Sequence, residues 1–204
     1  MADSSRFKEL LKRFEGYSEK PYTDAKGNPT IGIGTNLNSP EVSQILQNMG
    51  YDVGKVKTGE QPLTPEELDR LANEQIMEKD RYLQTIQKSD FPNYSPKENE
   101  LNALRSLMYH SPKMIGPEMR KKLDANDRFG AFNEIVGRSN KNKEAGVQFR
   151  RLQEAEEFAG EQAPEYFDRL PASDVESMRQ ILDQTQDPSH LEEIKKKFPK
   201  IWQK

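Results

Sequence analysis

Two acidic residues near the start of the chain, Glu15 and Asp24, have the chemistry of a catalytic pair. Glu15 ends a predicted helix, where unsatisfied carbonyl groups disfavour a negative charge. Asp24 precedes a polar turn around Gly27 and Asn28, where solvation and backbone N–H donors favour the ionised form. One proton donor and one ionised carboxylate are what the hydrolysis of a glycosidic bond requires. The chain has 34 acidic residues, so these two alone also fit a pair of surface carboxylates without a catalytic role.

A helix and a hairpin are expected around this pair. Apolar residues recur at i, i+3, i+4 and i+7, which predicts a helix over residues 5–15. The pattern then changes, and residues 22–24 and 30–34 are typical of two short strands around a tight turn. We therefore expect a small sheet directly after the first helix, and this sheet carries Asp24 and Thr30.

Three later helices share one start signal, a Ser or Thr cap followed by Pro at the first helical position. They are predicted to begin at Ser39, Thr64 and Ser95. The helix from Thr64 keeps its apolar periodicity to about Ile86, which makes it long enough to connect two lobes. Further helices are predicted over residues 118–123, 127–136 and 143–158.

The helical pattern restarts after Gly160, with capping signals at Ser173 and Ser189. We therefore expect a main domain over residues 1–159 and a small helical C-terminal extension over residues 160–204. The predicted fold class is α+β. It comprises a small N-terminal lobe with a short antiparallel sheet, a long helix between lobes and a larger helical C-terminal lobe.

The composition argues against several classes of function. Apolar residues make up 33% of the 204 and charged residues 32%, which favours amphipathic helices. No run of about 18 apolar residues exists, so no transmembrane segment is expected, and the charged residues 1–12 do not resemble a signal peptide. Cysteine is absent and the two histidines, His110 and His190, lie far apart, so we expect no metal and no other cofactor. The net charge of −3 argues against a nucleic-acid partner.

The segment from Glu15 to Gly34 resembles the catalytic segment of the T-even phage lysozymes, glycoside hydrolase family 24. In that family a Glu ends the first helix, an Asp follows nine residues later, and a Thr six residues further opens a T-I-G-x-G strand; Glu15, Asp24 and Thr30 have this spacing. The resemblance implies that Glu15 is the general acid, that Asp24 is the base that directs water, and that the Thr30 hydroxyl holds this water. It also implies inversion at the sugar carbon.

The resemblance extends from about Phe7 to Phe158. Residues 64–68 look like the start of the family's long interlobe helix, and residues 102–110 look like its central buried helix. In that helix an aromatic and a polar residue reach the cleft, and Tyr109 and His110 occupy those positions here. The implied substrate-binding residues are Gly34, Thr35, Asn36, Tyr109, His110 and Arg150.

Two departures from the family pattern affect the site. The family often has His directly after the T-I-G-x-G strand, whereas this chain has Thr35. The family's Arg that pairs with the catalytic Glu is not clearly placed. Gln148 occupies its apparent position, and Arg150 and Arg151 are the candidate substitutes.

The resemblance implies a muramidase, or endolysin, that cleaves the β-1,4 bond between N-acetylmuramic acid and N-acetylglucosamine in bacterial peptidoglycan. A lytic transglycosylase is one alternative, but it needs no carboxylate to direct water. A virion structural or wall-binding component with this fold and little turnover is another. We expect a monomer. It stays in the host cytoplasm until a holin releases it, or it is packaged in the virion, where residues 160–204 contact virion proteins.

Overall fold

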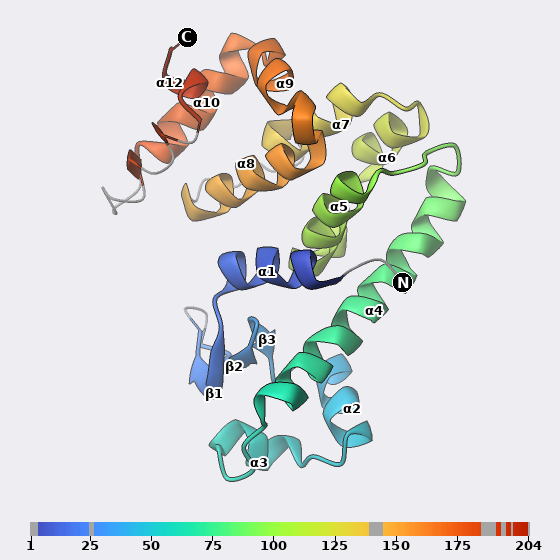
Figure 1. Cartoon of the computed structure of the whole chain (residues 1–204), viewed down its shortest axis with the longest axis vertical. Helices are drawn as coiled ribbons and strands as arrows, with labels where there is room; N and C mark the ends of the chain where they lie inside the picture. Colours follow the sequence, from blue (N-terminus) through green and yellow to red (C-terminus); the bar gives the residue numbers. More distant parts are fainter. Residues whose placement is uncertain are drawn as a thin grey trace. The chain divides into compact units, whose positions relative to one another are not determined.

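The structure is a computed structural model that describes residues 4–24, 27–138, 145–184, 191–192, 195–196 and 198–203. The chain divides into two units, residues 1–82 and residues 83–204 (Figure 1). Each unit has its own cluster of buried apolar side chains, so the two are described separately.

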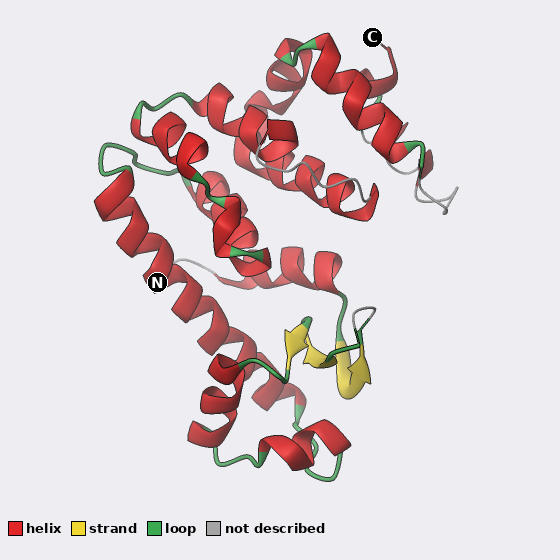
Figure 2. Cartoon of the chain, turned by 180° about the vertical axis from the view of Figure 1, so that it is seen from behind, coloured by secondary structure: helices red, strands yellow, loops and turns green. Residues whose placement is uncertain are grey.

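The first unit contains the predicted helix and hairpin. Helix α1 (Ser4–Glu15) is followed by strands β1 (Ser18–Thr23), β2 (Pro29–Gly32) and β3 (Thr35–Asn36), which form an antiparallel sheet in the order β1-β2-β3. The end of α1 at Glu15 and the sheet directly after it confirm the prediction. Figure 2 shows the short sheet beside a mostly helical chain, in agreement with the predicted α+β class.

The register of the sheet places three residues in one row. Tyr22 on β1 lies opposite Thr30 on β2, and Thr30 lies opposite Asn36 on β3. Directly opposite residues of an antiparallel sheet project from the same face. Ile31 and Thr35, which are also paired, therefore belong to the other face, where Ile31 is fully buried.

The core of the first unit lies between this sheet and three helices. Helices α2 (Pro40–Asn48) and α3 (Val53–Thr58) precede the long helix α4 (Pro65–Asp90). The buried cluster of this unit consists of Ile31, Leu37, Val42, Leu46, Val56, Leu63, Leu68 and Leu71. Helix α2 was predicted, but α3 was not, because its six residues bury only Val56 and show no helical period.

Helix α4 begins with the capping arrangement that the sequence predicted. The backbone N–H of Glu67 donates to Thr64 Oγ1 at 3.2 Å, and the backbone N–H of Thr64 donates to Glu67 Oε2 at 2.8 Å. These two bonds satisfy donors that a helix end leaves open. The helix is 26 residues long and continues from the first unit into the second.

No helix in the described part of the chain is long and apolar enough to cross a membrane.

The second unit is helical over its described residues. Up to residue 159 its elements are α5 (Glu98–His110), a 3-10 turn (Pro112–Met114), α6 (Pro117–Asp124), α7 (Arg128–Asn133), a π-helical turn (Glu134–Arg138) and α8 (Ala145–Ala159). The prediction of one helix over residues 127–136 was therefore only partly correct, since the last part changes to π geometry. Residues 143 and 144 of the predicted last helix lie outside the described residues.

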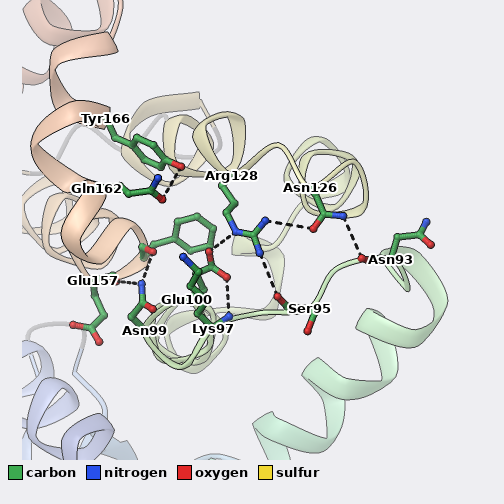
Figure 3. A network of polar contacts seen from close by, with 11 residues as sticks. Asn93, Ser95, Lys97, Asn99, Glu100, Asn126, Arg128, Glu157, Gln162 and Tyr166 are labelled. Carbon is green, nitrogen blue, oxygen red and sulfur yellow. Dashed lines mark hydrogen bonds and ion pairs between the residues drawn. The ribbon is translucent and has the colours of Figure 1, made fainter.

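The predicted start of a helix at Ser95 is wrong, and a buried polar network explains why (Figure 3). Glu100, only 2% exposed, accepts hydrogen bonds from the backbone N–H of Lys97 at 2.8 Å and from Arg128 Nε at 2.7 Å. Arg128 Nη2 also donates to the carbonyl oxygen of Ser95 at 3.3 Å. The segment before Glu98 is thus held in a non-helical path, and α5 begins at Glu98 with Lys97 as its cap residue.

Residues beyond 160 share the core of the second unit. They form a 3-10 turn (Gly160–Gln162), α9 (Ala163–Arg169), α10 (Ala172–Leu182) and α12 (Lys200–Gln203). The Phe167 ring lies 5.1 Å from the Phe132 ring and 5.4 Å from the Phe198 ring, centroid to centroid. Helix α9 was not predicted. The predicted cap at Ser173 is wrong, since α10 begins at Ala172, and the cap at Ser189 lies outside the described residues.

Candidate active site

Glu15 lies against Gly34, a glycine in the turn that follows strand β2. It is the last residue of α1, half-buried, and followed by Gly16, whose φ of +75° ends the helix. A Cβ atom placed on Gly34 would lie 2.9 Å from Glu15 Cβ and 3.1 Å from Glu15 Oε2. Gly34 also has a φ of +62°, a conformation that other residues rarely adopt. The turn after β2 therefore needs glycine, and this glycine lets the carboxyl group approach the turn closely.

Asp24 is held by Asn28 through the turn that joins β1 to β2. Asp24 Oδ1 accepts a hydrogen bond from the backbone N–H of Asn28 at 2.8 Å, and Oδ2 accepts one from Asn28 Nδ2 at 3.1 Å. The backbone N–H of Asp24 also donates to the carbonyl oxygen of Asn28 at 2.9 Å. Donors on both carboxylate oxygens stabilise the negative charge and fix the orientation of the group.

Thr30 is joined to the same asparagine. Its Oγ1 donates to the carbonyl oxygen of Asn28 at 3.1 Å, and the residue is 2% exposed. A hydroxyl group that donates one hydrogen bond keeps acceptor lone pairs on its oxygen. The structure thus brings Asp24 and Thr30, two of the three predicted catalytic residues, together around Asn28.

The phenol of Tyr22 connects Glu15 electrostatically with this pair. Burial raises the pKa of Tyr22 above its ordinary value of 10.0, and the negative charges of Asp24 and Glu15 raise it further. Both carboxyl groups therefore act on one side chain. Because Tyr22 also lies opposite Thr30 in the sheet, all three predicted catalytic residues belong to one neighbourhood of the first unit.

The other predicted residues of the first unit have contacts of their own. Thr35 is 2% exposed, and its Oγ1 donates to Gln75 Oε1 at 2.7 Å, which fastens β3 to α4. Asn36 is half-buried, and its Oδ1 accepts from the backbone N–H of Asn38 at 2.8 Å. Substrate binding by Gly34, Thr35 and Asn36 stays a prediction. At Thr35 the backbone would have to bind the substrate, because the hydroxyl already donates to Gln75.

The remaining predicted residues belong to the second unit. Tyr109 is half-buried and His110 exposed at the end of α5. Arg150 is 7% exposed, and its guanidinium donates to Glu154 Oε1 at 3.0 Å and to the carbonyl oxygen of Ser106 at 3.3 Å. The roles of these three residues in substrate binding stay predictions.

The residues considered as partners of Glu15 also have described contacts. Gln148 Nε2 donates to the carbonyl oxygen of Val136 at 2.8 Å. Arg150 and Arg151 both pair with the buried Glu154, whose carboxylate also accepts from Ser106 Oγ at 2.6 Å. The sequence did not single out Glu154 as their partner, although its spacing of four and three residues within one helix permits both ion pairs.

Sequence reasoning also missed two residues of the first unit. Asn28 was treated only as part of a polar turn, although Asp and Asn side chains commonly hydrogen-bond to nearby backbone groups in turns, as Asp24 does to the Asn28 N–H. Tyr22 was assigned only to a strand. In the described residues, no group of three or more His, Asp or Glu side chains is placed to hold a metal ion.

A helix that ends in a glutamate, a hairpin that carries an aspartate and a threonine, and a long helix before a helical unit together define a lysozyme-type glycoside hydrolase. The model of the phage lysozyme family matches residues 12–154, and the chain belongs to this family. It is a muramidase that degrades bacterial peptidoglycan. No curated protein is significantly similar to the chain in sequence.

Proposed function

We propose that Glu15, Asp24 and Thr30 are the catalytic residues and that they cleave the β-1,4 bond between N-acetylmuramic acid and N-acetylglucosamine with inversion. The observation that carries this proposal is the arrangement around Asn28, which binds both the Asp24 carboxylate and the Thr30 hydroxyl. A carboxylate and a hydroxyl oriented by one residue are suited to hold a water molecule.

The steps follow from the chemistry of these groups. Glu15 donates its proton to the glycosidic oxygen while the bond from this oxygen to the sugar carbon breaks. A water molecule held by Asp24 and the Thr30 hydroxyl attacks the same carbon from the opposite face, and Asp24 takes up the water proton. Glu15 is left ionised and Asp24 protonated, and exchange with solvent restores both.

The carboxylate and the threonine distinguish this proposal from the alternatives. A lytic transglycosylase closes an anhydro ring without an external water, so it has no use for Asp24 and Thr30 in this arrangement. A structural or wall-binding component would not need Gly34 to leave room for Glu15. Hydrolysis uses all of these features.

We assign recognition of the glycan strand to Gly34, Thr35 and Asn36 in the first unit and to Tyr109, His110 and Arg150 in the second. This assignment is based on the resemblance to the family. The six residues differ widely in exposure. His110 is exposed, whereas Arg150 is buried beside Glu154. A role for Arg150 would therefore consist in orienting neighbouring groups or in binding through the edge of its guanidinium.

We further propose that the enzyme acts for a phage in host lysis or wall penetration as a monomer. The family match ends at residue 154, which supports a catalytic domain over residues 1–159 and an extension over residues 160–204. The extension adds its apolar side chains to the core of the second unit. A contact with virion proteins would therefore use the outer surface of the extension. If the enzyme is not packaged in the virion, a holin would release it from the host cytoplasm.

The catalytic assignment is tested with Glu15→Gln, Asp24→Asn and Thr30→Ala in an assay of peptidoglycan solubilisation. Removal of the general acid lowers the rate by about 10²-fold or more, and each of the other two variants also lowers it. Glu9→Gln, which changes an exposed glutamate of the same helix, is the control and keeps the full rate. Wild-type activity in folded Glu15→Gln would contradict the assignment.

A further inference from the structure

One exposed aromatic side chain lies beside the proposed catalytic residues without a role in the reaction as described above. Tyr22 is 39% exposed on β1, an edge strand of the sheet. Its position in the sheet, directly opposite the buried Thr30, brings the Cβ atoms of the two residues to about 4.5–5.5 Å.

Asp24 belongs to the same face. Successive side chains of a strand alternate between faces, so Tyr22 and the residue two positions later project in one direction. The backbone bond from Asp24 N–H to Asn28 O continues the hairpin to this position. The row across the sheet therefore runs through Tyr22, Thr30 and Asn36, with Asp24 at its edge.

The phenol is a hydrogen-bond donor at the pH of the reaction. Burial, the charge of Asp24 and the charge of Glu15 all raise the pKa of Tyr22, so its hydroxyl proton is retained well above neutral pH. A neutral phenol beside two carboxyl groups cannot replace either of them as acid or base. It can donate to an oxygen of the sugar and cover one side of the sugar with its ring, because tyrosine combines an apolar body with a polar tip.

We propose that Tyr22 is a substrate-contacting residue, whose ring borders the sugar at the cleavage point and whose hydroxyl donates a hydrogen bond to it. This inference rests on the proposed function, since it places the sugar beside Glu15, Asp24 and Thr30. In this role Tyr22 fixes the position of the glycosidic bond relative to these three catalytic residues.

Tyr17 provides a matched control. It is a tyrosine of the same unit and is 44% exposed, close to the value for Tyr22. Burial and then the charges of Glu19, Asp69 and Glu66, not those of Glu15 or Asp24, raise the pKa of its phenol. The Lys12 ammonium lies 5.0 Å from the centroid of its ring. Tyr17 is therefore similar in type and exposure but has different surroundings.

The experiment compares Tyr22→Phe and Tyr22→Leu with Tyr17→Phe and Tyr17→Leu in the full-length enzyme. Rates of solubilisation are measured over a range of concentrations of dye-labelled peptidoglycan, together with the melting temperature. Tyr22→Phe lowers kcat/KM about 2- to 10-fold, the effect of one neutral hydrogen bond, and Tyr22→Leu lowers it further. The loss appears chiefly as a higher KM with an unchanged melting temperature, and both Tyr17 variants match the wild type.

Wild-type kcat/KM in both Tyr22 variants would overturn the proposal. So would a loss that appears only as a lower kcat with a lower melting temperature, because this indicates a merely structural role. Glu15→Gln is measured in parallel. If it is inactive while the Tyr22 variants are normal, only the role of Tyr22 fails, whereas an active Glu15→Gln shows that the catalytic assignment itself is wrong.

Discussion

Gly34→Ala tests whether the turn after β2 is built to admit the Glu15 side chain. The added Cβ would lie 2.9 Å from Glu15 Cβ and 3.3 Å from Glu15 Cγ. Carbon atoms in favourable contact are about 3.5–4.0 Å apart, so the first of these distances is too short by about 0.6 Å. Glu15 Cβ is fixed to the helix backbone, so it cannot rotate away, and either the end of α1 or the turn itself must move.

Two costs add in this variant. Alanine in the left-handed conformation of Gly34, φ +62°, costs about 1–2 kcal/mol, and overpacking costs about 1–3 kcal/mol. For a chain of this length the combined cost of about 2–5 kcal/mol corresponds to a melting temperature lower by roughly 4–20 °C. Displacement of a catalytic group by about 1 Å can cost about 10²-fold in rate, so we expect the folded variant to lose most of its activity.

Gly59→Ala is the matched control for the conformational cost. Gly59 has a φ of +77° and caps α3, and a Cβ atom there would meet no atom within 4 Å. This variant should lose about 1–2 kcal/mol of stability and keep its activity. The measurements are thermal unfolding by circular dichroism and the rate of peptidoglycan solubilisation per folded molecule. If Gly34→Ala is as active as Gly59→Ala, Glu15 does not need this close approach, and the reasoning fails.

Three further variants test other parts of the structure. Asn28→Ala removes the side-chain donor to Asp24 but keeps the backbone one, so it should lower the rate about tenfold, the effect of one charge-assisted hydrogen bond, while an unchanged rate would refute this role. The hydrogen bond from Tyr51 and then the backbone N–H that caps α4 lower the pKa of Glu67 below 4.5. Its contribution to stability is therefore present above the unfolded pKa and lost as the pH falls through the folded one, so Glu67→Gln should flatten the acid side of a melting-temperature profile. Truncation after Gly160 removes apolar side chains from the core of the second unit, so it should lower the melting temperature, and equal stability would show that this packing contributes nothing.

The sequence predicted the structure best where the apolar period agreed with the capping and turn residues. The end of α1 at Glu15, the hairpin and the long helix from Thr64 were predicted because apolar period, caps and turn residues agree there. The short helix α3 was missed because Val56 alone provides its buried face, although Asp52 and Gly59 are recognisable caps.

Contacts between distant residues were beyond the reach of local patterns. Glu100 and Arg128 are 28 positions apart, and their ion pair holds the same carboxylate that accepts from the Lys97 N–H at the start of α5. The bond from Thr35 to Gln75 spans 40 positions and buries a residue that the resemblance had assigned to substrate binding. Such pairings depend on how the elements pack, and neither capping nor periodicity encodes them.

In the proposed reaction, a water molecule held by Asp24 and Thr30 attacks the sugar carbon from the face opposite the leaving group while Glu15 donates a proton. The most direct test follows the first products of purified glycan strands by time-resolved proton NMR. We expect new reducing ends on N-acetylmuramic acid that appear first as the α anomer, because inversion of a β linkage gives this form. Initial appearance of the β anomer, or of 1,6-anhydro-muramic ends instead of reducing ends, would contradict it.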